Sequence, residues 1–83
     1  MQTHEITIQS TGMRAKSVRF CTQVAEQYKS GIWIEQDGHR TNAKSVLGVM
    51  SAQLSGGSTI TLLADGVDES EAIHALVALV SGI

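Results

Sequence analysis

The sequence predicts a small α+β domain in which four strands form one open-faced sheet and three helices cover one side of it. Apolar and polar residues alternate in four short segments, as they do in strands with one buried face. Three other segments repeat their apolar residues every three or four positions, as amphipathic helices do. The 83 residues contain no proline, repeat or linker. Residues 1–83 are therefore expected to form a single domain with the order β-α-β-β-α-β-α.

The first strand and the first helix follow from residues 4–28. Residues 4–9 alternate polar and apolar side chains and predict a half-buried strand. Residues 15–28 predict a helix, whose apolar stripe consists of Val18, Cys21, Val24, Ala25 and Tyr28. Gly31 is expected to end this helix by adopting a positive φ.

A hairpin is predicted next. Residues 32–36 alternate again, which places Trp33 on the opposite face from Ile32 and Ile34. Asp37-Gly38 is a strong turn signal because a two-residue hairpin loop needs a positive φ at both positions. Residues 39–42 would return as a short strand. The face that carries Trp33 is expected to remain in water.

The second half of the chain predicts a short helix, a strand and a long helix. Residues 45–54 form the weaker helical segment, and Gly56-Gly57 ends it. Residues 59–64 predict the fourth strand. Asp68 is expected to cap the last helix, with Glu71 completing a capping box. The apolar stripe of that helix consists of Ala72, Ile73, Leu76, Val77 and Val80.

Composition excludes several classes of protein. The chain is 42% hydrophobic and 17% charged, which is typical of a soluble globular domain. No apolar run is long enough to cross a membrane, and residues 1–9 lack the features of a signal peptide. A single cysteine cannot form an intrachain disulfide, so a cytoplasmic location is expected. A net charge of −2 argues against direct binding to nucleic acid.

The usual signatures of cofactor and metal sites are missing from the sequence. Neither a GxxxxGK[ST] nor a GxGxxG motif occurs. The three histidines (His4, His39 and His74) are scattered, and a lone cysteine gives no zinc spacing. Cys21 falls on the apolar stripe of its helix, which favours a buried thiol over a reactive one. No metal or cofactor is therefore expected.

A cluster of cations lies at the start of the first predicted helix. Arg14, Lys16 and Arg19 lie within six residues, at the end where unpaired N–H groups and the helix dipole already place positive charge. Stability alone would favour acidic residues there. Arg14, Lys16 and Ser17 are therefore a candidate anion site. Three solvated basic residues with nothing to bind remain the alternative.

The segment Asn42-Ala43-Lys44-Ser45-Val46-Leu47-Gly48-Val49-Met50 is the second candidate site. Ser45 stands where a helix N-cap is expected, and a phosphate added there would meet the favourable end of the dipole. Exposed Leu47 and Met50 beside a switchable charge would suit a protein partner. A plain capping serine above core residues is the alternative.

These segments resemble the HPr family of the bacterial sugar phosphotransferase system. Residues 42–50 are similar to the family's regulatory serine segment almost position for position, and residues 57–64 and 65–72 also fit the family. The resemblance covers nearly the whole chain. It implies an antiparallel sheet with strand order 1-4-2-3, and a carrier or regulatory protein rather than an enzyme.

The loop before the first helix departs from the family. Where the family has Gly-Leu-His-Ala-Arg-Pro, this chain has Gly12-Met13-Arg14-Ala15-Lys16-Ser17. The resemblance thus places Arg14 at the histidine that accepts phosphate from enzyme I. A guanidinium stays protonated and cannot be the nucleophile that imidazole is. Phosphocarrier activity at this position is therefore expected to be absent.

A relative without the histidine but with the serine resembles the Crh group. The resemblance implies phosphorylation of Ser45 by HPr kinase/phosphorylase, followed by binding to a CcpA-type transcription regulator or to other phosphotransferase-system proteins. Arg14, Lys16, Leu47 and Met50 are the implied partner-binding residues. Lys16 replaces a family arginine that contributes to CcpA binding, and a lysine lacks the bidentate fork.

Two alternatives to this regulatory role stay open. The chain could be a carrier that uses another acceptor, for which Thr11, Ser17 and His39 are the nearby candidates. It could also keep only the fold and dock to enzymes of the system without turnover.

Overall fold

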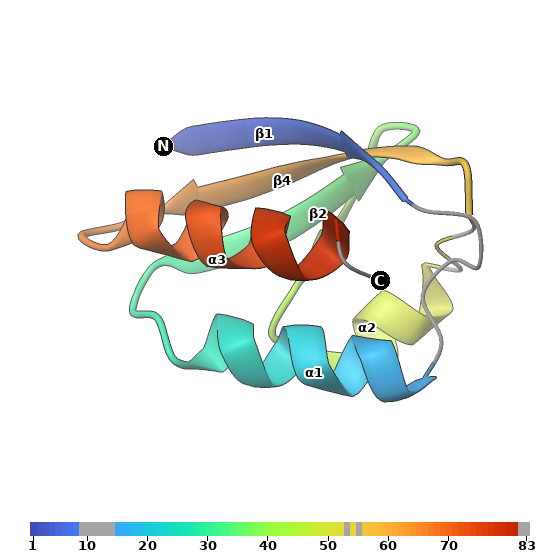
Figure 1. The fold of residues 1–83 in the computed structure, drawn as a ribbon, viewed down its shortest axis with the longest axis horizontal. Coiled ribbons are helices and arrows are strands. Elements are labelled where there is room, and N and C mark those ends of the chain that lie inside the picture. Colours follow the sequence, from blue (N-terminus) through green and yellow to red (C-terminus); the bar gives the residue numbers. More distant parts are fainter. Residues whose placement is uncertain (9–14, 53, 55, 82–83) are drawn as a thin grey trace.

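The computed structural model describes residues 1–8, 15–52, 54 and 56–81, and it confirms the expected α+β architecture. Figure 1 shows the helices on one side of the sheet. The elements in chain order are β1 (Gln2–Thr7), α1 (Ala15–Glu26), β2 (Gly31–Gln36), β3 (His39–Asn42), α2 (Val46–Ser51), β4 (Thr59–Asp65) and α3 (Glu69–Ser81).

The sheet is antiparallel throughout, with the order β1-β4-β2-β3 that the family resemblance implies. Its helix-facing side supplies much of the core, because alternate residues of the two central strands point that way. The helices add residues of their predicted apolar stripes. The buried side chains include Ile32, Ile34, Ile60, Leu62 and Ala64 from the strands, and Val18, Ala25, Ala72 and Leu76 from the helices. No helix in the described part of the chain is long and apolar enough to span a membrane.

The open side of the sheet carries Trp33, as predicted, but its ring is only half-exposed. The ring lies over Gly31, where an added Cβ would collide with Cη2 and stand 3.0 Å from Cζ2. Gly31 does not adopt a positive φ, so the prediction that it ends the helix in this way is wrong. The residue is instead the first of β2, and its missing side chain makes room for the indole.

The first helix is shorter than predicted, whereas the predicted hairpin turn is present. The helix α1 stops at Glu26 rather than Tyr28, because the N–H groups of Gln27 and Tyr28 bond back only three residues, to Val24 and Ala25. The predicted hairpin turn is confirmed: Asp37 has φ +52° and Gly38 φ +81°. Asparagine and aspartate tolerate this left-handed conformation better than most residues do.

Asp68 does not cap α3 with its side chain, so the predicted capping box with Glu71 is wrong. Its carbonyl oxygen accepts from Ala72 N at 3.0 Å, as an N-cap does, but its carboxylate reaches another segment. It accepts bonds from Lys29 N at 2.8 Å, Ser30 N at 2.9 Å and the Ser30 hydroxyl. These bonds stabilise the carboxylate and lower the pKa of Asp68 to about 2. The largest contribution comes from the Ser30 hydroxyl and the next from the Lys29 N–H.

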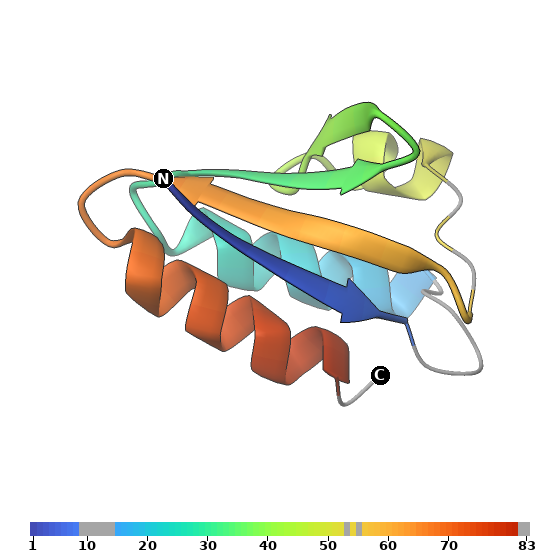
Figure 2. The same cartoon turned by 90° about the horizontal axis from the view of Figure 1, so that it is seen from above.

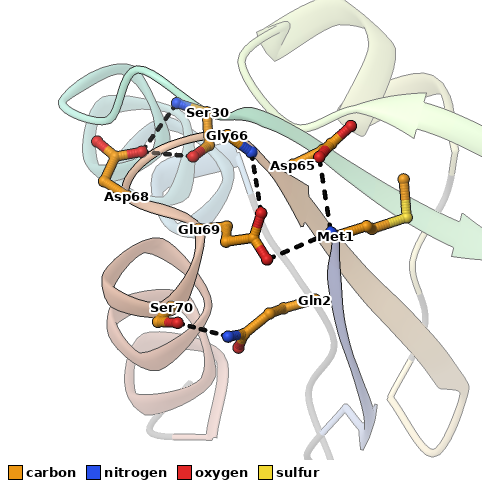
Figure 3. A network of polar contacts seen from close by, with 8 residues as sticks. All are labelled: Met1, Gln2, Ser30, Asp65, Gly66, Asp68, Glu69 and Ser70. Carbon is orange, nitrogen blue, oxygen red and sulfur yellow. Dashed lines mark hydrogen bonds and ion pairs between the residues drawn. The ribbon is translucent and has the colours of Figure 1, made fainter.

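A neighbouring polar network ties β1 to the start of α3 (Figure 3). The amino group of Met1 lies 3.3 Å from Glu69 Oε2 and 3.6 Å from Asp65 Oδ1. Glu69 also accepts from Gly66 N at 3.1 Å, and this bond is the main cause that lowers the pKa of Glu69. The amino group just before β1 is thus paired with carboxylates at the end of β4 and the start of α3, at the end of the molecule that lies away from α2.

Candidate functional site

Ser45 stands at the N-cap of α2, as the sequence predicts. Its backbone is extended, with φ −105° and ψ 112°, and its Oγ accepts from Gly48 N at 3.0 Å. A Cβ at Gly48 would lie only 3.1 Å from Oγ and 3.2 Å from Thr41 Cγ2. Glycine at this position therefore lets the first turn of α2 close tightly around the serine and pack on β3.

The residues before Ser45 are fixed by three further bonds. Asn42 Oδ1 accepts from Lys44 N at 2.9 Å, which is an Asx-turn. Asn42 O accepts from Ser45 N at 3.1 Å, and Lys44 Nζ donates to the carbonyl of Tyr28 at 2.8 Å. The last of these bonds joins the segment to the turn that follows α1. Ser45 is thus held on a structured turn and is partly accessible.

The residues after Ser45 present apolar side chains to solvent. Leu47 is 80% exposed and Met50 is 47% exposed, whereas Val49 between them is buried in the core. A six-residue helix can bury only one narrow face, so the remaining apolar residues must point outwards. The sequence analysis expected Leu47 and Met50 to be exposed in this segment, and the structure agrees.

Phe20 is a candidate that the sequence analysis missed. It lies on α1, which packs against α2, and it is 54% exposed. The signal that could have found it is its position off the stripe of Val18, Cys21 and Ala25. Phenylalanine is enriched in the cores of protein interfaces relative to the rest of the surface, whereas serine and most charged residues are depleted there.

Only part of the candidate anion site lies among the residues that the structure describes. Arg14 lies outside the described residues, and the side chain of Lys16 does as well. Ser17 is in the first turn of α1 and is half-buried. That turn contains no acidic residue. Anion binding by these three residues therefore stays a prediction.

The remaining titratable candidates lie apart. His4, His39 and His74 are exposed on β1, β3 and α3. In the described part of the chain, no three His, Cys, Asp or Glu residues gather as metal ligands would. Cys21 is buried, and its burial raises its pKa to about 11, so its thiolate is disfavoured at neutral pH.

Comparison with known proteins decides the family. The model of the HPr component of the phosphotransferase system, which describes that component's phosphorylation site, matches residues 2–82. The chain belongs to the HPr family. HPr-family proteins are carriers or regulators rather than enzymes, and the three helices on one face of a 1-4-2-3 sheet agree with this membership.

Both Crh-type and HPr-type proteins are similar to this HPr-family chain. The HPr-like protein Crh of Halalkalibacterium halodurans is 46% identical over 70 residues, which are 84% of this chain and 83% of that protein. The phosphocarrier protein HPr of Neisseria meningitidis is 39% identical over 75 residues, covering 90% of this chain and 84% of that protein. The crystal structure of HPr-C-His from Thermoanaerobacter tengcongensis superposes with a TM-score of 0.94 at 41% identity, covering 99% and 93%.

Proposed function

We propose that this chain is a regulatory HPr-family module, switched by phosphorylation of Ser45 in the manner of Crh-like proteins. The observation that carries the proposal is the position of Ser45. Ser45 is the N-cap of α2 and is partly accessible, and the apolar side chains of Leu47 and Met50 that follow it are exposed. A charge added at Ser45 would therefore stand beside an apolar contact surface.

The local electrostatics favour a phosphate at this position. Phosphorylation adds a charge of about −1.5 to −2 at neutral pH. The first turn of α2 contains no acidic residue to repel it, and the Gly48 N–H already points at the serine oxygen. The fold should therefore be retained after modification, and the effect should appear in binding.

The partners we propose are those that the family resemblance implies. HPr kinase/phosphorylase would add the phosphate. A CcpA-type regulator or another phosphotransferase-system protein would supply a cation to it and a pocket for Leu47 and Met50. Arg14 and Lys16 are proposed to contact the same partner, and with Ser17 they would form the proposed anion site. Phe20, which is exposed on α1, is a further candidate for this contact.

Arg14 disfavours the carrier alternative. It stands at the position where the family resemblance places the phosphoaccepting histidine, and a guanidinium has no free electron pair for that transfer at physiological pH. Among the alternative acceptor candidates, His39 has an imidazole, but it is the first residue of β3 and does not lie at the start of α1. A carrier role would therefore need chemistry that the residue at position 14 does not offer.

The experiment that tests the proposal separates the hydroxyl of Ser45 from its capping role. Ser45→Asn removes the phosphorylatable group but keeps an N-cap side chain of equal quality. Ser51→Asn, at the other end of α2, is the matched control. With ATP and HPr kinase/phosphorylase, the wild-type chain and Ser51→Asn should each take up one phosphate, and Ser45→Asn should take up none.

A second experiment tests whether phosphorylation changes the affinity for the partner. Phosphorylated protein should bind the partner more tightly than unmodified protein, and Leu47→Ala or Met50→Ala should weaken that complex without preventing phosphorylation. Uptake of phosphate by Ser45→Asn, or equal partner affinity with and without the phosphate, would contradict the proposed switch.

A further inference from the structure

Lys44, the residue before Ser45, reaches across to the end of another helix. Its Nζ donates to the carbonyl oxygen of Tyr28 at 2.8 Å, a contact between residues 16 positions apart in the chain. Tyr28 belongs to the turn that follows α1. Figure 2 shows α2 next to the β3 edge of the sheet, and residues 43–45 connect the two. The side chain of Lys44 therefore links the start of α2 to the C-terminal end of α1.

The Tyr28 carbonyl lies where a positive charge stabilises α1. The last carbonyl groups of a helix lack partners within the helix, and they form the negative end of its dipole. The last turn of α1 contains no basic residue, and the N–H groups of Gln27 and Tyr28 extend it by bonding three residues back. Lys44 thus supplies from another segment a cation that the last turn of this helix lacks.

The ammonium of Lys44 has donors to spare. It carries three N–H donors, and the described residues provide one acceptor, the neutral carbonyl of Tyr28. The ion pairs among those residues do not include Lys44. A half-buried ammonium whose acceptor is neutral would be attracted to a nearby anion, because attraction between opposite charges then adds to the hydrogen bond.

A phosphate on Ser45 would be such an anion, and it would stand within reach. Consecutive Cα atoms are about 3.8 Å apart, and a lysine carries its ammonium on a flexible four-carbon stem. The backbone here is fixed independently of the lysine side chain, because Asn42 accepts from both Lys44 N and Ser45 N. The ammonium can therefore turn from Tyr28 towards position 45 while the turn keeps its shape.

We propose that Lys44 is a relay: phosphorylation of Ser45 draws its ammonium from the Tyr28 carbonyl to the phosphate and so loosens the end of α1. The inference rests on the phosphorylation proposed at Ser45, and it adds a consequence of that modification within the protein itself. One side chain changes its partner, and the fold is retained. The modified serine is then sensed on α1 as well as on α2.

Protein with phosphoserine at position 45, introduced during synthesis, tests the relay without the kinase. The carbonyl carbon chemical shift of Tyr28 reports the hydrogen bond that its oxygen accepts. In the wild-type background, the phosphate should move this resonance upfield. Amide hydrogen exchange at Gln27 and Tyr28 should become about two- to fivefold faster, as expected when a helix C-terminus loses a cation.

Two lysine variants assign the response to one side chain. Lys44→Met keeps an unbranched side chain but removes the charge, so the Tyr28 carbonyl should resonate upfield already in the unmodified protein. Adding the phosphate should then move it no further. Lys29→Met removes the exposed lysine that follows Tyr28 and is the charge-matched control. Its difference between modified and unmodified protein should equal that of the wild type.

Two outcomes would overturn the relay. One is a Tyr28 carbonyl that does not move when Ser45 carries the phosphate. The other is an equal movement in Lys44→Met, because the charge of the phosphate alone would then explain it. Treatment of the wild-type chain with ATP and HPr kinase/phosphorylase separately decides whether Ser45 is modified. Absence of phosphate there would contradict the proposed function and leave the result on the relay unchanged.

Discussion

Replacement of Gly31 by alanine should destabilise the protein, although alanine normally suits a strand better than glycine does. A Cβ at this position would collide with Cη2 of Trp33 and stand 3.0 and 3.1 Å from Cζ2 and Cζ3. The indole would have to leave its place over the strand. The only way to accommodate the methyl group is therefore to expose the ring or to shift it from its preferred rotamer.

The size of the effect follows from two opposing terms. Overpacking of this kind destabilises by about 1–3 kcal/mol. In a Trp33→Ala background the collision is absent, and Gly31→Ala should then stabilise by about 0.5–1 kcal/mol, because alanine restricts the unfolded chain and Gly31 does not have a positive φ. The double-mutant cycle should thus give a coupling energy of about 1.5–4 kcal/mol.

Urea denaturation followed by circular dichroism measures all four proteins of the cycle. Trp33 is the only tryptophan, so its fluorescence reports the displacement of the ring directly, and the emission of Gly31→Ala should move to longer wavelength. The same free-energy change for Gly31→Ala in both backgrounds would refute the reasoning, because it would show that the indole does not occupy the space above Gly31.

Two further predictions concern polar groups in the described residues. Because its folded pKa of about 2 lies below the ordinary value of 3.8, Asp68 stabilises the fold above that range and loses this contribution as the pH falls through it. The melting temperature measured between pH 4 and pH 2 should therefore fall less in Asp68→Asn than in the wild type; an equal fall would contradict the role of this carboxylate. Thr22 Oγ1 is buried without a hydrogen-bond partner in the described residues, so Thr22→Val should stabilise by about 1–3 kcal/mol in thermal denaturation, and Thr22→Ser should not.

The sequence predicts the elements well where the periodicity of apolar residues decides them. The stripe of α1 is buried at Val18, Cys21 and Ala25, and the Asp37-Gly38 turn has the positive φ angles that its residues favour. Local patterns of this kind depend on neighbours within a few positions. They can therefore be predicted before any tertiary contact is known.

The errors occur where a long-range contact competes with a local one. Asp68 has the right neighbours for a capping box, yet donors at Lys29 and Ser30 take its carboxylate. Gly31 follows a helix and suits a helix stop, but its role is set by the ring of Trp33.

At the candidate site, the N-cap role of Ser45 and the exposure of Leu47 and Met50 were predictable, because capping preference and helix length are local properties. The exposure of Phe20 was not predicted. It is an apolar residue of an ordinary helical segment, and the packing of α1 decides that it faces solvent.

The regulatory proposal is tested most directly by offering this protein two phosphate donors and measuring its intact mass after each. One reaction contains ATP and HPr kinase/phosphorylase, the other phosphoenolpyruvate and enzyme I, and an ordinary HPr is treated in parallel as the positive control for both. The account predicts one stable phosphate on Ser45 from the first reaction and none from the second. Phosphate transfer from enzyme I, with no modification by the kinase, would contradict it and identify the protein as a carrier.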